Sequence, residues 1–151
     1  MRGLLSGANL VALCDPDQGM IDKARADTSR SGGEAAKDAK AYEDYRRLLD
    51  NASSFDAVLV ATPDHWHVPM SLLALEAGKD VFCEKPTKVI SEGRALIEEV
   101  KKRNAVFQIG LEDRSVSQYH KMVEWLRNGA IGDISHLRAY WNGGGVWTRA
   151  R

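Results

Sequence analysis

Three short polar segments contain residue types that could carry chemistry, and Lys85 is the most distinctive of these residues. It stands between Glu84 and Pro86 at the end of an apolar run, a setting that suits a cleft. There its ammonium group could polarise a substrate hydroxyl or carbonyl and relay a proton. The alternative is an ordinary surface lysine. The only argument against it is that other polar segments also follow apolar runs in this sequence.

The second segment is Thr62-Pro63 with the histidines that follow it. Thr62-Pro63 turns the chain while presenting a hydroxyl and amides, and His65 and His67 flank Trp66, where they could orient a ligand. The alternative is a helix N-terminus with exposed histidines. The i, i+2 spacing, with no further Cys or His cluster, argues against a metal site.

The third segment is Asp15, after the first apolar run, and Arg114 follows the last run in the same way. An acidic residue placed like Asp15 can hold the ribose hydroxyls of an adenine dinucleotide and repel the 2′-phosphate of NADP, whereas the alternative is a turn or N-cap aspartate. Arg114 could reach a cofactor or substrate, or form a surface salt bridge.

Four continuous apolar runs must position these segments. They are typical of strands buried on both faces, as in a parallel sheet, and cover 10–14, 57–61, 80–83 and 106–110. Helical spacing and capping residues predict helices over 17–28, 42–49, 68–76, 91–103 (with Ser91 as the cap) and 117–127, and a polar loop over 29–38. Gly78 and Gly129 are expected to end two of them.

This alternation predicts an α/β fold with a doubly wound parallel sheet. Because residues 134–141 alternate apolar and polar side chains, we expect a strand with one wet face there, which would open a second, α+β domain. The expected division is a partial dinucleotide-binding domain over 1–114, followed over 115–151 by a connecting helix and the first strand of the second domain.

Composition narrows the classes of protein that fit. The 151 residues are 44% apolar and 28% charged, with 21 basic and 21 acidic side chains. This balance is typical of a soluble globular protein and argues against nucleic-acid or membrane partners. Cys14 and Cys83 lack metal-like spacing and are expected as buried free thiols in a cytoplasmic protein.

Several motifs, in this order, resemble those of the Gfo/Idh/MocA family of NAD(P)-dependent oxidoreductases, the glucose–fructose oxidoreductase and inositol dehydrogenase group. They are 61–67 (ATPDHWH), 77–81 (AGKDV), 84–86 (EKP), 108–110 (QIG) with 114–115 (RS), and 129–134 (GAIGDI). The resemblance extends over nearly the whole chain. It implies a Rossmann-like domain, NAD as cofactor (NADP being disfavoured by Asp15), and hydride transfer to or from a sugar or polyol.

The resemblance also implies residue roles. Asp15 matches the acidic residue on the adenosine ribose, and Thr62, Pro63 and His67 match the loop beside the cofactor's ribose and nicotinamide. Glu84 matches a residue near the nicotinamide ribose, Lys85 the active-site lysine, and Pro86 a turn whose Lys–Pro bond is often cis in relatives. Arg114 is the candidate substrate contact.

The chain departs from the family at both ends. Relatives begin with a strand and a G-x-G-x-x-G turn that holds the pyrophosphate, and only residues 2–7 resemble the tail of that turn. We therefore expect a fragment that lacks the first strand and most of the second domain. Two other functions stay open: an inactive remnant that serves as an interaction or assembly module, including a homo-oligomer, and a relative that uses NAD for redox-assisted glycoside cleavage.

Overall fold

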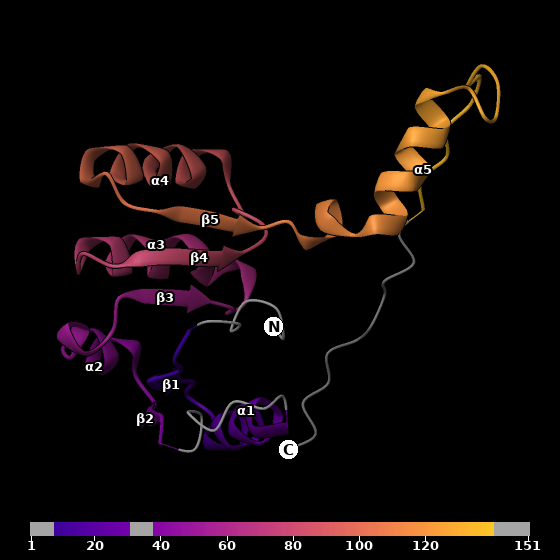
Figure 1. The fold of residues 1–151 in the computed structure, drawn as a ribbon. Coiled ribbons are helices and arrows are strands. Elements are labelled where there is room, and N and C mark those ends of the chain that lie inside the picture. The colour runs from indigo at the N-terminus through magenta and orange to yellow at the C-terminus, as the bar shows by residue number, and fades with distance from the viewer. Residues whose placement is uncertain (1–7, 31–37, 141–151) are drawn as a thin grey trace. The chain divides into compact units, whose positions relative to one another are not determined.

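The computed structural model describes residues 8–30 and 38–140, which form an α/β fold with parallel strands (Figure 1). The chain divides into two compact units, residues 1–110 and 111–151, which are described separately below. The expected domain boundary at residue 114 remains a prediction. Residues 2–7, which resemble the end of a phosphate-binding turn, lie outside the described residues.

The first unit contains two parallel sheets. Strands β1 (Ala12–Cys14) and β2 (Lys40–Tyr42) form one, and β3 (Ala57–Val60), β4 (Asp80–Glu84) and β5 (Phe107–Gly110) form the other, in the order β3-β4-β5. The four apolar runs thus all contain the expected strands. The common dinucleotide-binding order is 3-2-1-4-5-6, so these five strands match positions 2 to 6, and no strand among the described residues takes position 1.

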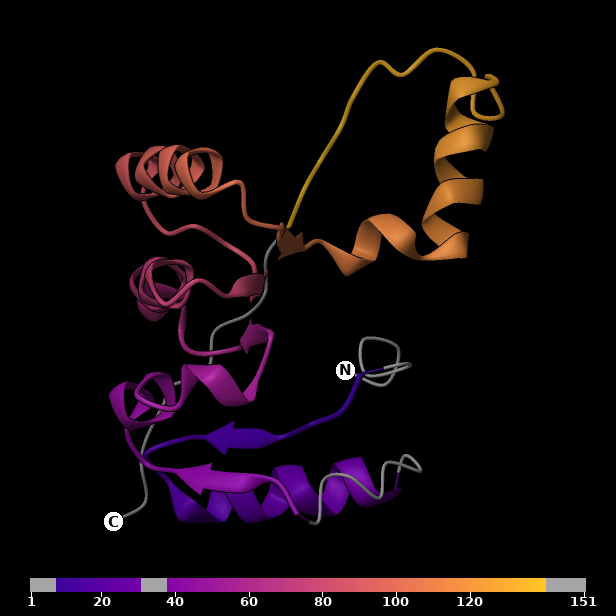
Figure 2. The same ribbon diagram turned by 60° about the vertical axis from the view of Figure 1, so that its left-hand side comes forward.

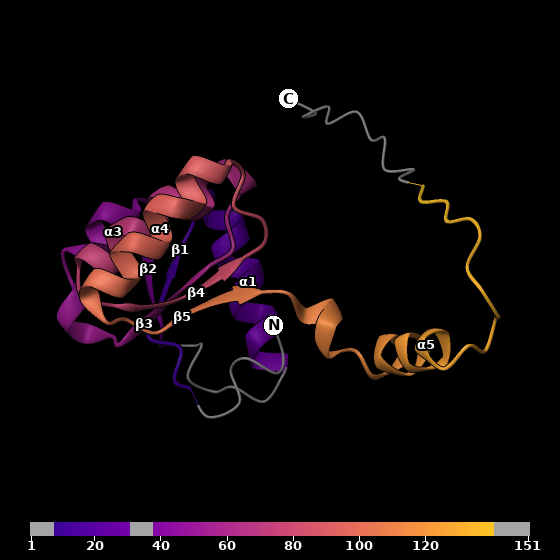
Figure 3. The same ribbon diagram turned by 90° about the horizontal axis from the view of Figure 1, so that it is seen from above.

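Helices return the chain between the parallel strands. Helix α1 (Gln18–Arg30) contacts β1 and lies beside the two-stranded sheet (Figure 2). Helices α3 (His67–Glu76) and α4 (Ile90–Arg103) pack against each other on one face of the three-stranded sheet (Figure 3). The sheet and these two helices enclose the main core, whose fully buried members are Val60, Val68, Ala74, Leu75, Val81, Cys83 and Leu96.

Local sequence explains where α3 begins and ends. The 3₁₀ helix η3 (Asp64–Trp66) leads into it, and Pro63 lies just before that turn with an extended backbone. At its end Gly78 has a φ of +72°, the left-handed conformation that glycine adopts without steric cost. The strand–turn–helix path therefore places residues 62–66 at the carboxyl end of β3.

Three predicted boundaries were wrong. The helix predicted over 42–49 is the strand β2 followed by the short helix α2 (Tyr45–Leu49), because the Asp44 carboxylate accepts a hydrogen bond from the Arg46 amide (2.9 Å) and starts the helix after Tyr42. Helix α1 continues to Arg30, into the expected loop over 29–38. Ser91 does not cap α4, since the helix begins at Ile90 and Val89 holds the cap position.

The second unit consists, among the described residues, of the 3₁₀ helix η4 (Glu112–Ser115), helix α5 (Ser117–Arg127) and an extended tail. Helix α5 matches its predicted bounds, and Gly129 after it has a φ of +76°. The strand predicted over 134–141 was wrong for the described part: residues 134–140 are exposed and have no regular structure. A strand is stabilised by a partner ladder, and no described segment pairs with this one.

Candidate active site

The carboxyl ends of β3 and β4 bring together two of the three polar segments. Val60 pairs with Cys83 in the parallel register, so the residues that follow each strand emerge side by side. Glu84 in turn pairs with Gly110 at the end of β5. In open parallel sheets this edge is where ligands bind. Thr62-Pro63 and Glu84-Lys85-Pro86 therefore flank a common edge of the sheet.

Thr62 is half-buried at the start of the loop after β3. Its Oγ1 is buried, and no hydrogen-bond partner for it lies among the described residues. Its carbonyl oxygen lies 2.8 Å from Nε2 of His67. Pro63 is exposed, and its carbonyl oxygen accepts a hydrogen bond from the Trp66 amide (2.8 Å). A buried hydroxyl without a partner is costly, so Thr62 Oγ1 is a polar atom that the described residues leave unpaired.

His67 lies deeper than its motif suggested. The side chain is 1% exposed, and its two ring nitrogens lie next to main-chain oxygens: Nε2 by Thr62 and Nδ1, at 3.0 Å, by Pro86. Neither nitrogen is placed to contact a ligand. His65, by contrast, is exposed, and its ring packs beside Trp66, with 5.9 Å between the ring centroids.

Glu84 and Lys85 differ in their surroundings. Glu84 is half-buried, and its carboxylate lies across Gly110: a Cβ built on that glycine would be 3.0 Å from Glu84 Oε2. Lys85 is exposed at the strand end, and Pro86 after it is exposed as well. The Lys85–Pro86 peptide bond is cis. The strand end thus presents a half-buried carboxylate beside Gly110 and, next to it, an exposed lysine.

Cys83, directly before Glu84, faces the core. Its Sγ lies within reach of two main-chain oxygens, those of Glu84 (3.3 Å) and His67 (3.8 Å), and its single S–H can donate to either of them. Burial raises the pKa of the Cys83 thiol above its ordinary value. Burial, followed by the charge of Asp15, raises the pKa of half-buried Cys14 in the same way. Because only a thiolate is strongly nucleophilic, neither cysteine is suited to nucleophilic chemistry.

Asp15 follows β1 in the two-stranded sheet. Its amide continues the parallel ladder by donating to the Tyr42 carbonyl (3.1 Å), and its Oδ1 accepts a hydrogen bond from the Asp17 amide (2.8 Å). Asp15 therefore does stabilise the turn after β1, as the alternative interpretation expected. It leaves Oδ2 without a hydrogen bond among the described residues, so the carboxylate can still bind a ligand hydroxyl.

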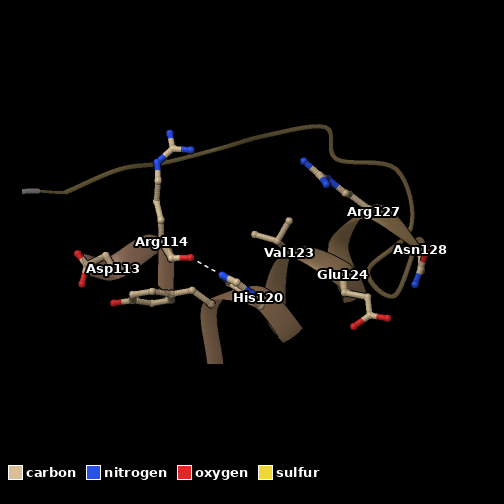
Figure 4. A pocket seen from close by; sticks show the side chains of 8 residues that line it. Asp113, Arg114, His120, Val123, Glu124, Arg127 and Asn128 are labelled. Atoms are coloured by element: carbon tan, nitrogen blue, oxygen red, sulfur yellow. Dashed lines mark hydrogen bonds between the residues drawn. The ribbon is translucent and has the colours of Figure 1, made fainter. Parts of the chain in front are cut away.

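Arg114 belongs to the second unit. It lies on η4, and its carbonyl oxygen contacts Nε2 of His120 on α5 (Figure 4). Its guanidinium points away from that contact, along an open groove of this unit. The groove is lined by Asp113, Arg114, Tyr119, His120, Val123, Glu124, Arg127 and Asn128. Its polar groups are all exposed, which marks a surface and not an enclosed site.

Two further observations describe what the described residues contain. No helix in residues 8–30 and 38–140 is long and apolar enough to cross a membrane. Over the same residues, no three His, Cys, Asp or Glu side chains gather as a group that could hold a metal ion. Gly110 is the site residue that sequence reasoning missed. It belongs to the 108–110 motif, but only the register across β4 and β5 reveals that Glu84 lies over it.

Comparisons with known proteins agree with this geometry. A family model described as "Oxidoreductase family, NAD-binding Rossmann fold" (GFO_IDH_MocA) matches residues 2–111. The chain is 36% identical to inositol 2-dehydrogenase 1 of Saccharopolyspora erythraea over 135 residues, and 31% identical to myo-inositol 2-dehydrogenase of Thermotoga maritima over 137. These alignments cover 88% and 90% of the chain but only 38% and 41% of the relatives.

Solved structures show the same fold. The crystal structure of myo-inositol 2-dehydrogenase from Lactobacillus plantarum superposes with a TM-score of 0.67 at 30% identity, covering 85% of this chain and 36% of that one. Scyllo-inositol dehydrogenase from Lactobacillus casei, with bound NAD(H) and scyllo-inositol, gives 0.64 at 26% identity, covering 83% and 35%. With its family match, strand order and strand-end motifs in agreement, the chain belongs to the Gfo/Idh/MocA family of oxidoreductases with an NAD-binding Rossmann fold.

Proposed function

We propose that this chain is part of an NAD-dependent dehydrogenase that moves a hydride between the nicotinamide and a carbon of a cyclic polyol such as inositol. The observation that carries the proposal is the shared edge at the ends of β3 and β4, where the buried Thr62 hydroxyl and the Glu84-Lys85 pair meet. The relatives named above, inositol dehydrogenases of four bacteria, support the polyol class.

The described residues fit the ribose-binding parts of NAD. Asp15 offers a carboxylate oxygen for the adenosine ribose, and Thr62 Oγ1 offers an unpaired hydroxyl at the next ligand loop. Glu84, held over Gly110, is the residue proposed for the nicotinamide ribose. Bound NAD supplies the carbon that accepts or returns the hydride, and the protein orients it.

Lys85 is proposed as the residue that manages the substrate proton. It is exposed at the strand end, directly after the carboxylate that is assigned to the cofactor. An ammonium group there polarises the reacting hydroxyl or carbonyl oxygen and stabilises the negative charge that develops on it. Pro63 and Pro86 are proposed to shape the two loops beside the cofactor, and Arg114 to contact the substrate.

The preference for NAD over NADP is proposed from the carboxylate of Asp15. A negative charge at the end of this strand accepts hydrogen bonds from the two ribose hydroxyls, whereas it repels a 2′-phosphate. The hydrogen bond from the Asp17 amide fixes Oδ1, so the carboxylate is already oriented before a ligand binds.

The whole protein that contains this chain is the right material for an activity test. With NAD and myo- or scyllo-inositol, we expect NADH to form, measured by its absorbance. Lys85→Ala is expected to slow turnover about 10²- to 10⁴-fold, the usual contribution of acid–base catalysis. Lys88→Ala is the matched control, because Lys88 is an exposed lysine three residues further along the same loop. No NAD reduction with any polyol, or equal losses in the two variants, would refute the proposal.

A further inference from the structure

His67 connects the loop after β3 to the loop after β4. It is the first residue of α3, and its ring lies between two main-chain oxygens that are far apart in the sequence. Nε2 is 2.8 Å from the carbonyl oxygen of Thr62, and Nδ1 is 3.0 Å from that of Pro86. One buried side chain therefore contacts both ligand loops.

The chemistry of the two partners makes this contact specific. Carbonyl oxygens only accept, so a neutral imidazole donates to one loop at a time and the protonated ring donates to both. The ring is 1% exposed, and water is therefore excluded from replacing either contact. A buried polar group must be paired to be tolerated, and removing the ring would take away its contact with both oxygens, one of which accepts its N–H when the ring is neutral.

We propose that His67 is a positioning residue, which fixes the loop of Thr62 against the loop of Glu84 and Lys85. The proposal rests on the proposed function and adds to it by assigning His67 no direct contact with cofactor or substrate. Its effect on binding is transmitted through two peptide groups. The carbonyl held by Nε2 belongs to the residue whose Oγ1 is buried and unpaired, so the same contact sets where that hydroxyl points.

On the other side, the carbonyl held by Nδ1 belongs to Pro86, one residue after Lys85. Fixing this peptide group restricts the path of the chain from the end of β4. The Cys83 thiol lies 3.8 Å from the main-chain oxygen of His67, so the residue before Glu84 also contacts this position. His67 thus ties together Thr62, Glu84 and Lys85 without using a polar atom that a ligand needs.

Two amide substitutions separate the two contacts. The side-chain amide of His67→Asn reaches the position of Nδ1, and that of His67→Gln reaches the position of Nε2. Asn therefore retains the contact with Pro86 and Gln the contact with Thr62, whereas His67→Ala retains neither. His136→Asn is the control, since His136 lies in the exposed segment 134–140.

Nuclear magnetic resonance of the full chain without any ligand tests directly whether His67 connects the two loops. In His67→Gln we expect the carbonyl ¹³C shift of Pro86 to change and amide exchange over 84–88 to accelerate about five- to tenfold, the equivalent of one hydrogen bond. In His67→Asn we expect the same changes at Thr62 and over 62–66. Amides of Leu75 and Val81 in the core report on global unfolding and are expected to be unaffected in both.

A titration with NADH of the whole protein carrying the same substitutions tests the consequence for binding. We expect both amide variants to bind about tenfold more weakly than the wild type and the control to be unchanged. The connection through His67 would be contradicted if the Asn and Gln variants changed the same loop. It would also be contradicted if exchange accelerated equally at Leu75 and Val81. Altered loops with unchanged NADH affinity would overturn the positioning role. A wild-type chain and whole protein that bind no NADH would instead contradict the proposed function, while the loop measurements would still decide the tie.

Discussion

At the scale of single residues, position in the fold decides how far each side chain is exposed. His65 and His67 are two residues apart, yet one is exposed and the other is 1% exposed with both ring nitrogens against main-chain oxygens. Glu84 and Lys85 are neighbours with the same contrast between a half-buried and an exposed side chain. Glu84 is the last residue of β4, whereas Lys85 lies just beyond the strand.

The cofactor preference is testable at Asp15. We expect Asp15→Ser to weaken NADH binding and to strengthen NADPH binding, because the serine removes the charge that repels a 2′-phosphate and can still accept the Asp17 amide. Binding of both nucleotides to the whole protein is measured by calorimetry. Asp17→Ser is the control, since the Asp17 carboxylate is engaged with the Gly19 amide at 2.8 Å. An unchanged ratio of the two affinities in Asp15→Ser would contradict the assignment.

Gly110 gives a second prediction at this scale. A Cβ there would lie 3.0 Å from Glu84 Oε2 and 3.3 Å from Phe82 Cε1, so Gly110→Ala must displace one or both side chains. We expect a loss of about 1–3 kcal/mol in the free energy of unfolding, typical of overpacking, together with weaker NADH binding.

The double variant Gly110→Ala/Glu84→Ala separates these effects. Removing the carboxylate should recover part of the stability lost in Gly110→Ala, as a double-mutant cycle of denaturant unfolding would show. The remainder reflects the Phe82 ring. If the two changes in the free energy of unfolding were strictly additive, the alanine Cβ would have no steric contact with Glu84.

At the scale of elements, the basic residues at the end of α4 illustrate how charge stabilises a helix end. Helix α4 ends in Lys101, Lys102 and Arg103, which suit the negative end of its dipole. Glu99 lies one turn earlier and accepts hydrogen bonds from Arg103 Nε (2.7 Å) and Lys102 Nζ (3.2 Å). These hydrogen bonds, that of Arg103 first, lower the pKa of Glu99 below its ordinary value.

This lowered pKa predicts part of the acid sensitivity of the fold. Because the carboxylate is favoured in the folded state, its contribution is present above the ordinary glutamate range and is lost as pH falls through the lowered folded pKa. We expect Glu99→Gln to be less stable than the wild type at neutral pH, and the difference to shrink in acid. Thermal unfolding across the acid range measures it, with exposed Glu98→Gln as the control. A difference independent of pH would contradict the assignment.

At the scale of the whole molecule, the two sheets of the first unit are unequal. The main core lies against β3, β4 and β5, whereas the fully buried apolar residues nearest the other sheet are Ile21 on α1 and Ala39 before β2. A two-stranded sheet is marginal without further packing, and among the described residues no ladder joins it to β3.

Hydrogen exchange should therefore resolve two levels of stability. We expect amides of β1 and β2 to exchange about tenfold or more faster than those of β4, because the smaller sheet opens with less loss of buried apolar surface. Exchange measured under native conditions on the full chain tests this. Equal protection in β1 and β4 would show that the first unit opens as a single cooperative body.

Much of the fold was predictable because its signals are local. Unbroken apolar runs predicted four strands, and turn residues after them predicted where a ligand edge forms. Strand β2 was missed, since the three residues Lys40–Tyr42 carry no run of their own and form a strand only by pairing with β1. The strand expected over 134–141 failed for the converse reason: its alternating pattern has no partner among the described residues.

The sequence by itself determined the α/β class, the family and the residues that gather at the carboxyl ends of the strands, because periodicity and strand-end motifs are properties of short segments. Only the tertiary structure decided which of those residues are buried and which are exposed at that edge. The register across β3, β4 and β5 sets Glu84 over Gly110, and the return of α3 brings the His67 ring between Thr62 and Pro86. Such contacts join residues that are distant along the chain, so no local pattern encodes them.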